Sequence, residues 1–207
     1  MNIARLLFPV RTLGIGDRVG VWFQGCPHKC YRCANPELWD REPMNEINDE
    51  EAELLISLAL RGTVPDGFTI TGGEPFAQAV GLKRLLRIAR KWSDDILIYS
   101  GYTLDELVSM KDDDIDWVLH NCAALITGRY IDELNDGSYL RGSSNQILHI
   151  LNESLRYDYE RDFVTGVRQI QSFPLSDGLF SVGIHPRGFR EVINTGAINL
   201  GLEETIE

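Results

Sequence analysis

Three of the four cysteines lie within eight positions, in the segment GCPHKCYRC (residues 25–33), with the spacing Cys26-x3-Cys30-x2-Cys33. Structural zinc sites and electron-transfer iron–sulfur clusters normally use four protein ligands. Three thiolates would leave one iron of a 4Fe-4S cluster without a protein ligand, and an open metal position is one where a substrate can bind. We therefore predict a 4Fe-4S cluster on these three cysteines. Zinc or another structural metal is the alternative.

The fourth cysteine is not needed for this site. Cys122 lies in the apolar run WVLHNCAALITG, and we expect it to be a small buried hydrophobe in a core strand. His28 stands inside the cysteine segment. We expect it to hydrogen-bond the backbone there.

A second motif, TITGGEPF (residues 69–76), follows the cysteines by some 40 residues, at the end of a predicted strand. Glycines allow the backbone to approach a ligand closely. The carboxylate of Glu74 can accept a charge-assisted hydrogen bond from an ammonium group. Ser100 ends the next predicted strand, and ligands collect at the carboxyl ends of strands in α/β folds. Without the cysteines, the Gly-Gly-Glu-Pro segment would be an ordinary turn.

The cysteine spacing and the Gly-Gly-Glu motif together resemble the radical S-adenosylmethionine superfamily. Three further stretches resemble the activating proteins of anaerobic ribonucleotide reductase, over roughly residues 10–150: CANPELW, YSGYTLDEL and ITGRYIDELNDGSYLRGSSNQ. The family usually has Asp-Gly-Arg where this chain has Thr127-Gly128-Arg129, and the tail from about Leu151 has no counterpart.

The resemblance implies an enzyme. S-adenosylmethionine would bind the open iron and, after one-electron reduction, cleave to methionine and a 5′-deoxyadenosyl radical that takes hydrogen from a glycine of a large partner protein. Flavodoxin or ferredoxin would supply the electron. The residues implied to bind S-adenosylmethionine are Thr71, Gly72, Gly73 and Glu74 at its methionine end and Ser100 at its ribose. Arg141, Ser143, Ser144 and Asn145 would contact the cofactor or partner, or only shape the rim.

Two alternatives stay open. The first is a radical enzyme of the same family that modifies another peptide or a small molecule. The second is a binding module for zinc or an iron–sulfur cluster that catalyses no reaction.

Strands and helices alternate along the chain around these motifs, which is typical of a parallel sheet with helical crossovers. Asn48 and Gly62 are expected to cap a helix, and Thr103 with Glu106 forms a capping box. The expected strands are residues 19–24, 67–71, 95–101, 115–121 and 123–128, of which the last two could be one broken strand. The expected helices are 48–62, 79–92 and 103–110. The acidic run at 112–116 is expected to be a loop, and residues 179–193 a hairpin with its turn at Pro186–Gly188.

The predicted fold is therefore a single α/β domain over residues 1–207, with a C-terminal β-hairpin elaboration at 151–207. We expect a parallel sheet curved into a partial, open TIM-like barrel, because a full barrel needs about 250 residues. Its open side would offer a wide mouth to a protein substrate.

Composition excludes some partners. The chain has 207 residues, 43% of them hydrophobic, and a net charge of −11 from 20 basic and 31 acidic residues. An acidic surface disfavours nucleic acid. No apolar run reaches the length of a membrane span, and the N-terminus lacks the pattern of a signal peptide. We expect a cytoplasmic protein that functions without oxygen and does not bind membranes.

Overall fold

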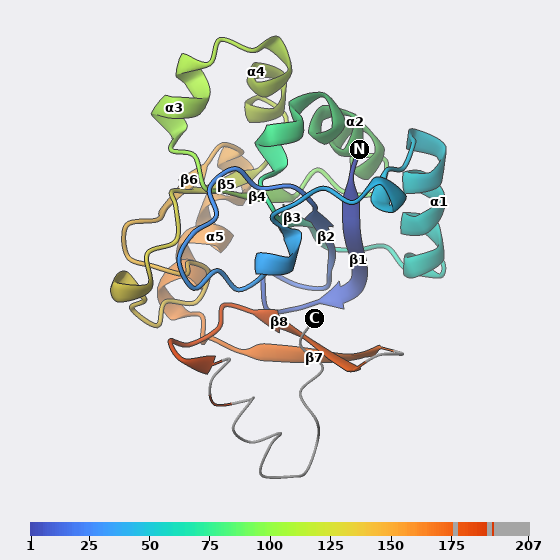
Figure 1. Cartoon of the computed structure of the whole chain (residues 1–207). Helices are drawn as coiled ribbons and strands as arrows, with labels where there is room; N and C mark the ends of the chain where they lie inside the picture. The colour runs from blue at the N-terminus through green and yellow to red at the C-terminus, as the bar shows by residue number, and fades with distance from the viewer. Residues whose placement is uncertain (176–177, 190–191, 193–207) are drawn as a thin grey trace.

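The computed structural model describes residues 1–175, 178–189 and 192. A six-stranded sheet in the order β1-β2-β3-β4-β5-β6 forms its centre (Figure 1). Strands β2 to β5 are parallel, and β1 and β6 flank them in the antiparallel sense. The bounds are β1 (Ile3–Val10), β2 (Arg18–Phe23), β3 (Gly67–Gly72), β4 (Ile96–Ser100), β5 (Ala124–Thr127) and β6 (Ile147–Ile150). The α/β fold with a mostly parallel sheet is thus as predicted.

The predicted barrel is not confirmed. In the part of the chain that the structure describes, β1 and β6 are the two edges of this sheet. The sheet is therefore open in its strand order, and the TIM-like curvature remains an expectation.

Helices cover both faces of the sheet. Because successive residues of a strand point to opposite faces, Ile96 and Ile98 of β4 pack in the larger core, whereas Leu97 packs beside Tyr159 in a separate core. The larger core also contains buried side chains of α1 (Asp49–Leu60), α2 (Ala79–Ala89), α3 (Leu104–Ser109) and α4 (Asp113–Leu119). Tyr159 belongs to α5 (Arg156–Thr165), so the tail contributes a helix to the second core.

The predicted helix caps are confirmed. Asn48 and Glu51 form a capping box at the start of α1, and Thr103 and Glu106 form one at the start of α3. Helix α1 ends at Leu60, and Gly62 follows with a positive φ of 83°. These local signals place two crossover helices correctly.

The strand predicted at residues 115–121 is wrong. Those residues belong mainly to α4, and the acidic run is its N-terminus, because the Asp112 side chain accepts hydrogen bonds from the N–H groups of Asp114 and Ile115. Acidic side chains in a first turn also suit the helix dipole. Cys122 is buried as predicted, but it lies between α4 and β5 rather than in a strand.

The C-terminal hairpin is present but is built from other residues than predicted. Strands β7 (Ile170–Leu175) and β8 (Gly178–Gly183) pair in the antiparallel sense as a separate two-stranded sheet. The expected turn at Pro186–Gly188 instead follows β8, and most of the second expected strand lies outside the described residues. Figure 1 shows the hairpin beneath the end of β1, where Val182 packs with Val10 and Trp22.

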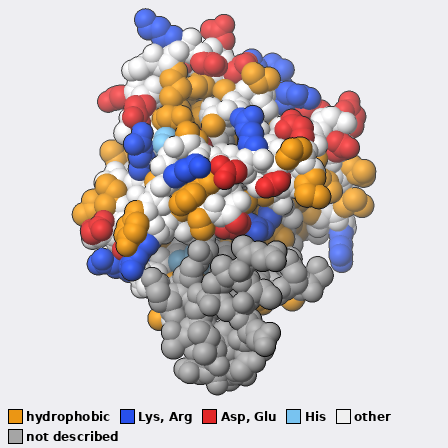
Figure 2. Space-filling view, in the orientation of Figure 1, with side chains coloured by type: hydrophobic (Ala, Val, Ile, Leu, Met, Phe, Trp, Pro, Cys, Tyr) orange, Lys and Arg blue, Asp and Glu red, His pale blue; other side chains and the backbone are white. Residues whose placement is uncertain are grey.

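The surface carries both charges. In the view of Figure 2, acidic and basic side chains are interspersed over the upper part of the molecule. None of the helices among the described residues is both long and apolar enough to span a bilayer.

Candidate cluster and cofactor site

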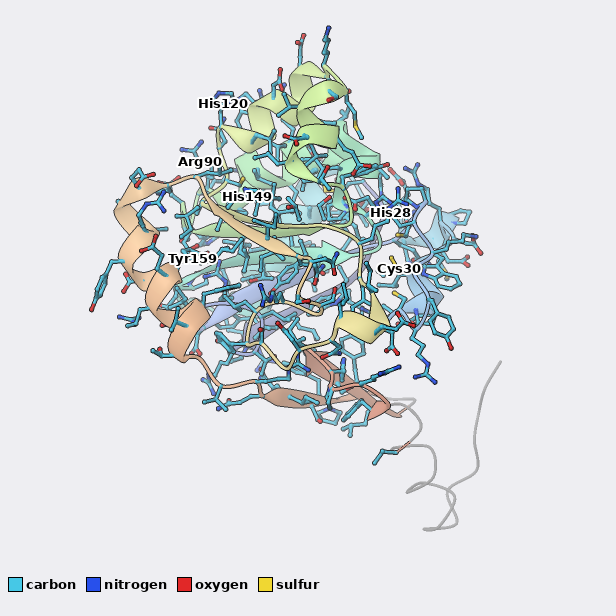
Figure 3. The ribbon with its side chains drawn as sticks, turned by 90° about the vertical axis from the view of Figure 1, so that its left-hand side faces the viewer. His28, Cys30, Arg90, His120, His149 and Tyr159 are labelled. Atoms are coloured by element: carbon cyan, nitrogen blue, oxygen red, sulfur yellow. The ribbon has the colours of Figure 1, made fainter. Side chains whose placement is uncertain are left out.

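The cysteine segment forms a loop that starts directly after β2. The chain at the end of this loop comes back to bond with the residues at its start. The N–H of Gly25 donates to the carbonyl of Leu38 at 2.8 Å, and the N–H of Cys26 donates to the carbonyl of Trp39 at 2.8 Å. Gly25 has a φ of 103°, which favours glycine. Figure 3 shows His28 and Cys30 on this loop, at the opposite end of the molecule from Tyr159. We call residues 25–39 the cluster loop.

The Gly-Gly-Glu motif is bonded to the base of the cluster loop. The N–H of Gly73 donates to the carbonyl of Phe23 at 2.7 Å, and the N–H of Glu74 donates to the carbonyl of Gly25 at 2.9 Å. A Cβ atom at Gly72 or Gly73 would lie 2.4 Å from the Phe23 or Gly25 carbonyl oxygen, respectively. Only glycines therefore allow the end of β3 to lie against the loop.

The carboxylate of Glu74 is buried and accepts hydrogen bonds from four protein groups. Its Oε1 receives the N–H of Phe76 and the hydroxyl of Ser100, both at 3.0 Å. Its Oε2 receives the N–H of Gly101 at 2.7 Å and lies 3.1 Å from His28 Nε2. A carboxylate has about four acceptor positions, so the protein itself occupies them. Sequence reasoning assigned this group to the cofactor and did not foresee the four internal donors.

His28 lies between the cluster loop and the end of β4. Its ring meets the ring of Tyr102 edge-on, with 4.4 Å between centroids, and a Cβ at Gly101 would lie 2.4 Å from the imidazole Cδ2. Its hydrogen-bond partner is the Glu74 side chain rather than the backbone that we expected. No sequence signal pairs these two residues.

One cavity of about 580 Å³ brings together the residues predicted to hold the cluster and S-adenosylmethionine, but not Arg141, Ser143, Ser144 or Asn145. It is lined by Cys26, Cys30, Cys33, Thr71, Gly72, Gly73, Glu74 and Ser100. Of the RGSSNQ stretch, Gly142 and Gln146 line it, whereas Arg141 pairs with Asp136 at 2.6 Å and the buried Ser143 hydroxyl accepts from the N–H of Ile131.

The Cys33 sulfur accepts one hydrogen bond from the backbone and lies near a second, unused donor. Burial raises the pKa of this thiol, and contacts from Asn35 and the Trp39 side chain partly offset the rise. The Asn35 N–H donates to Cys33 Sγ at 3.4 Å. The indole Nε1 of Trp39 is buried near this sulfur and makes no hydrogen bond to any described residue, so its N–H is a donor available to a group bound beside Cys33. Sequence reasoning missed Trp39.

These residues fit an iron–sulfur cluster with an adjacent organic cofactor. The cavity holds three thiols, a buried donor at one of them and a glycine cradle beside them. Thiolates ligate such clusters, and hydrogen bonds to their sulfurs adjust the reduction potential. Over the described residues, no group of three histidine, cysteine or acidic side chains is arranged to hold a single metal ion.

Comparison with known proteins agrees with this chemistry. Residues 12–149 match the family described as a 4Fe-4S single cluster domain. The anaerobic ribonucleoside-triphosphate reductase-activating protein of Enterobacteria phage T4 is 28% identical over 145 residues, which cover 65% of this chain and 85% of that protein. The pyruvate formate-lyase-activating enzyme of Staphylococcus aureus (strain USA300) is 34% identical over 86 residues, 38% of this chain and only 34% of the enzyme.

Proposed function

Because the chain belongs to the 4Fe-4S single cluster domain family, we propose that it is a radical S-adenosylmethionine enzyme whose cluster is held by Cys26, Cys30 and Cys33. When bound and reduced, the cluster would supply one electron to the sulfonium of S-adenosylmethionine. This cofactor would then divide into methionine and a 5′-deoxyadenosyl radical. We propose that this radical takes hydrogen from a glycine of a protein partner of the anaerobic ribonucleotide reductase type, as the phage T4 relative's name suggests.

The observation that carries this proposal is the single cavity. Eight residues chosen from three separate stretches of sequence line it together. A structural metal site needs neither the glycine cradle nor a cavity of about 580 Å³, which lies within the usual range for ligand sites.

The residues beside the thiols have distinct proposed roles. Thr71, Gly72 and Gly73 bring the backbone close to the methionine end of the cofactor. The hydroxyl of Ser100 donates its hydrogen to the Glu74 carboxylate. Its oxygen accepts from the N–H of Tyr102 at 3.1 Å, which fixes its direction at the cavity wall. Glu74 positions the cluster loop and the end of β4 relative to each other, and we propose this in place of a direct bond to the ammonium group.

A second candidate function keeps the chemistry and changes the target. Residues 179–189 line the cavity, and they lie beyond the matched region 12–149. This observation favours a radical enzyme that acts on a different peptide or on a small molecule.

One experiment distinguishes the two candidate functions. The anaerobically reconstituted protein would be reduced with dithionite or with flavodoxin or ferredoxin, and mixed with S-adenosylmethionine and the large subunit of an anaerobic ribonucleotide reductase from the same source. Both candidates predict 5′-deoxyadenosine. The first predicts in addition a glycyl-radical signal on the partner in electron paramagnetic resonance. Cleavage without that signal would select the second candidate.

A further inference from the structure

Helix α1 carries an apolar face on the side turned away from the core. Its buried residues are Ala52, Ile56 and Leu60. Leu54, Leu55 and Leu58 are 58%, 42% and 61% exposed, and they belong to none of the hydrophobic cores of the described residues. Single exposed leucines are common, whereas a contiguous group on one helix face is typical of an interface. We call these three residues the leucine stripe.

The leucine stripe lies away from the cluster site. Figure 1 places α1 at the right-hand flank of the molecule, and Figure 2 shows hydrophobic side chains gathered on the same flank. The described residues that line the cavity include none of α1. A partner on the stripe therefore leaves the cavity open, and the inference below does not depend on the proposed function.

Two charges stand at the ends of the leucine stripe. Other acidic residues of α1, Asp49 and Glu53, form ion pairs with cations of α2. Glu51, one turn before the stripe, and Arg61, just after it, form no ion pair with any residue that the structure describes. Glu51 accepts only the capping hydrogen bond from the N–H of Asn48. The stripe is thus bordered by one acidic and one basic side chain, both available to a partner.

These residues follow the spacing of a helix–helix seam. Positions 51, 54, 58 and 61 recur at intervals of three, four and three residues, which places them on one face of α1. The order along this face is acidic, apolar, apolar, basic. A second copy of α1 that runs antiparallel, with a two-fold axis beside Ile56, sets Leu54 opposite Leu58 of the partner subunit.

The same antiparallel register pairs the charges. It sets Glu51 opposite Arg61 of the partner subunit, and the two-fold axis repeats this pair at the other end of the seam. A parallel pair of helices would instead set glutamate against glutamate and arginine against arginine, which is unfavourable. The charges of α1 therefore complement a second α1 in the antiparallel direction only.

We propose that the leucine stripe is where two copies of this chain meet, as a symmetric dimer with antiparallel α1 helices. Dimer formation removes the six leucines from water and gives both Glu51 and Arg61 an oppositely charged neighbour. One helix from each chain makes a small interface. We therefore expect a reversible dimer, with a Kd of roughly 1–100 μM.

Sedimentation equilibrium of the full chain measures this association directly. The salt concentration should be about 0.15 M, because charges more than about 8 Å apart are then largely screened and the negative net charge of each copy opposes the dimer less. The average mass should rise with protein concentration from the 23.4 kDa of one chain towards twice that value. The rise should be the same before and after reconstitution of the cluster, because α1 lies outside the cavity.

Leu58→Asp should raise the dimer Kd at least tenfold, because the two-fold axis places two unpaired carboxylates in the seam. The position is exposed in the single chain, so the fold should be kept, which circular dichroism checks. Val108→Asp is the matched control. Val108 is 54% exposed on another helix, α3, and its replacement should leave the Kd unchanged.

A charge reversal tests the register. Arg61→Glu sets like charges opposite each other and should raise the Kd severalfold. Adding Glu51→Gln to Arg61→Glu should recover part of this loss. Glutamine removes the like charge but keeps a side-chain acceptor for the N–H of Asn48, so the helix cap is retained.

Three results would overturn the proposal. A mass of one chain at every concentration up to about 1 mM would show that the stripe does not bind a second copy. A dimer that Leu58→Asp leaves intact would place the interface elsewhere. Failure of Glu51→Gln to improve association of the Arg61→Glu variant would contradict the antiparallel register. None of these results depends on whether 5′-deoxyadenosine is formed.

Discussion

His28 Nε2 lies 3.1 Å from Glu74 Oε2, and the two side chains are 4% and 1% exposed. An ionised carboxylate only accepts hydrogen bonds, so this imidazole nitrogen carries the hydrogen. The contact joins the middle of the cysteine segment to the Gly-Gly-Glu motif, two stretches that the sequence separates by 46 positions. The loop that presents the thiols is thereby held to the end of the sheet.

Glu74→Gln should weaken both the cluster loop and cofactor binding. A glutamine amide has one acceptor oxygen and an NH₂ group that would face a donor, so buried hydrogen bonds are lost. The expected cost is about 1–3 kcal/mol of stability. Iron should leave the variant faster in the presence of a chelator, and the affinity for S-adenosylmethionine should fall. Iron release is followed by absorbance, and binding by the change in the electron paramagnetic resonance signal of the reduced cluster.

Glu37→Gln is the matched control, because Glu37 also lines the cavity but pairs with Arg5 at a half-exposed position. It should leave both readouts unchanged. If Glu74→Gln weakened cofactor binding with iron release unaltered, the carboxylate would act on the cofactor directly, as the sequence alone suggested.

Trp39→Phe should lower the reduction potential of the cluster. With a cluster bound, a hydrogen bond from the indole N–H of Trp39 to the Cys33 sulfur would stabilise the reduced, more negative cluster more than the oxidised one. A difference of about 1 kcal/mol corresponds to roughly 40 mV for a one-electron couple. A redox titration monitored by electron paramagnetic resonance measures the shift. Trp117→Phe, on α4, is the control. Equal potentials in wild type and Trp39→Phe would contradict a hydrogen bond from Trp39 to the cluster.

Tyr159→Phe should destabilise the whole chain. The Tyr159 hydroxyl donates to Asp95 Oδ1 at 2.5 Å, and Asp95 also pairs with the fully buried Arg18. Losing one partner of this buried network should cost about 1–3 kcal/mol. Urea unfolding should show one transition shifted to lower urea, with Tyr157→Phe on the exposed side of α5 unchanged. Two separate transitions would contradict the single domain that we predict.

Local signals in the sequence predicted much of the fold. Side-chain caps at Asn48 and Thr103 act within a few residues, and the strands that end at Gly72 and Ser100 are apolar runs bounded by glycine. The error at residues 115–121 came from treating an apolar run as a strand. The helical signals in the sequence were the capping residue Asp112 and the apolar residues Ile115 and Val118 three positions apart, which the structure buries.

The candidate site was predictable where chemistry lies in a motif. The three cysteines and the Gly-Gly-Glu motif have fixed spacings, and all of their residues line the cavity. The contacts between distant segments were not predictable, because the positions of His28 opposite Glu74 and of Arg187 opposite Asp132 depend on tertiary packing. The hairpin was misplaced for the same reason, since β8 pairs with the preceding strand β7.

The most direct test of the central claim is the formation of 5′-deoxyadenosine by the reconstituted, dithionite-reduced protein with S-adenosylmethionine, measured by mass spectrometry beside metal content. Wild type and Cys122→Ala should hold about four irons and form the product. Cys26→Ala, Cys30→Ala and Cys33→Ala should do neither. A full cluster that yields no 5′-deoxyadenosine, or zinc as the only metal bound after anaerobic reconstitution, would contradict the account.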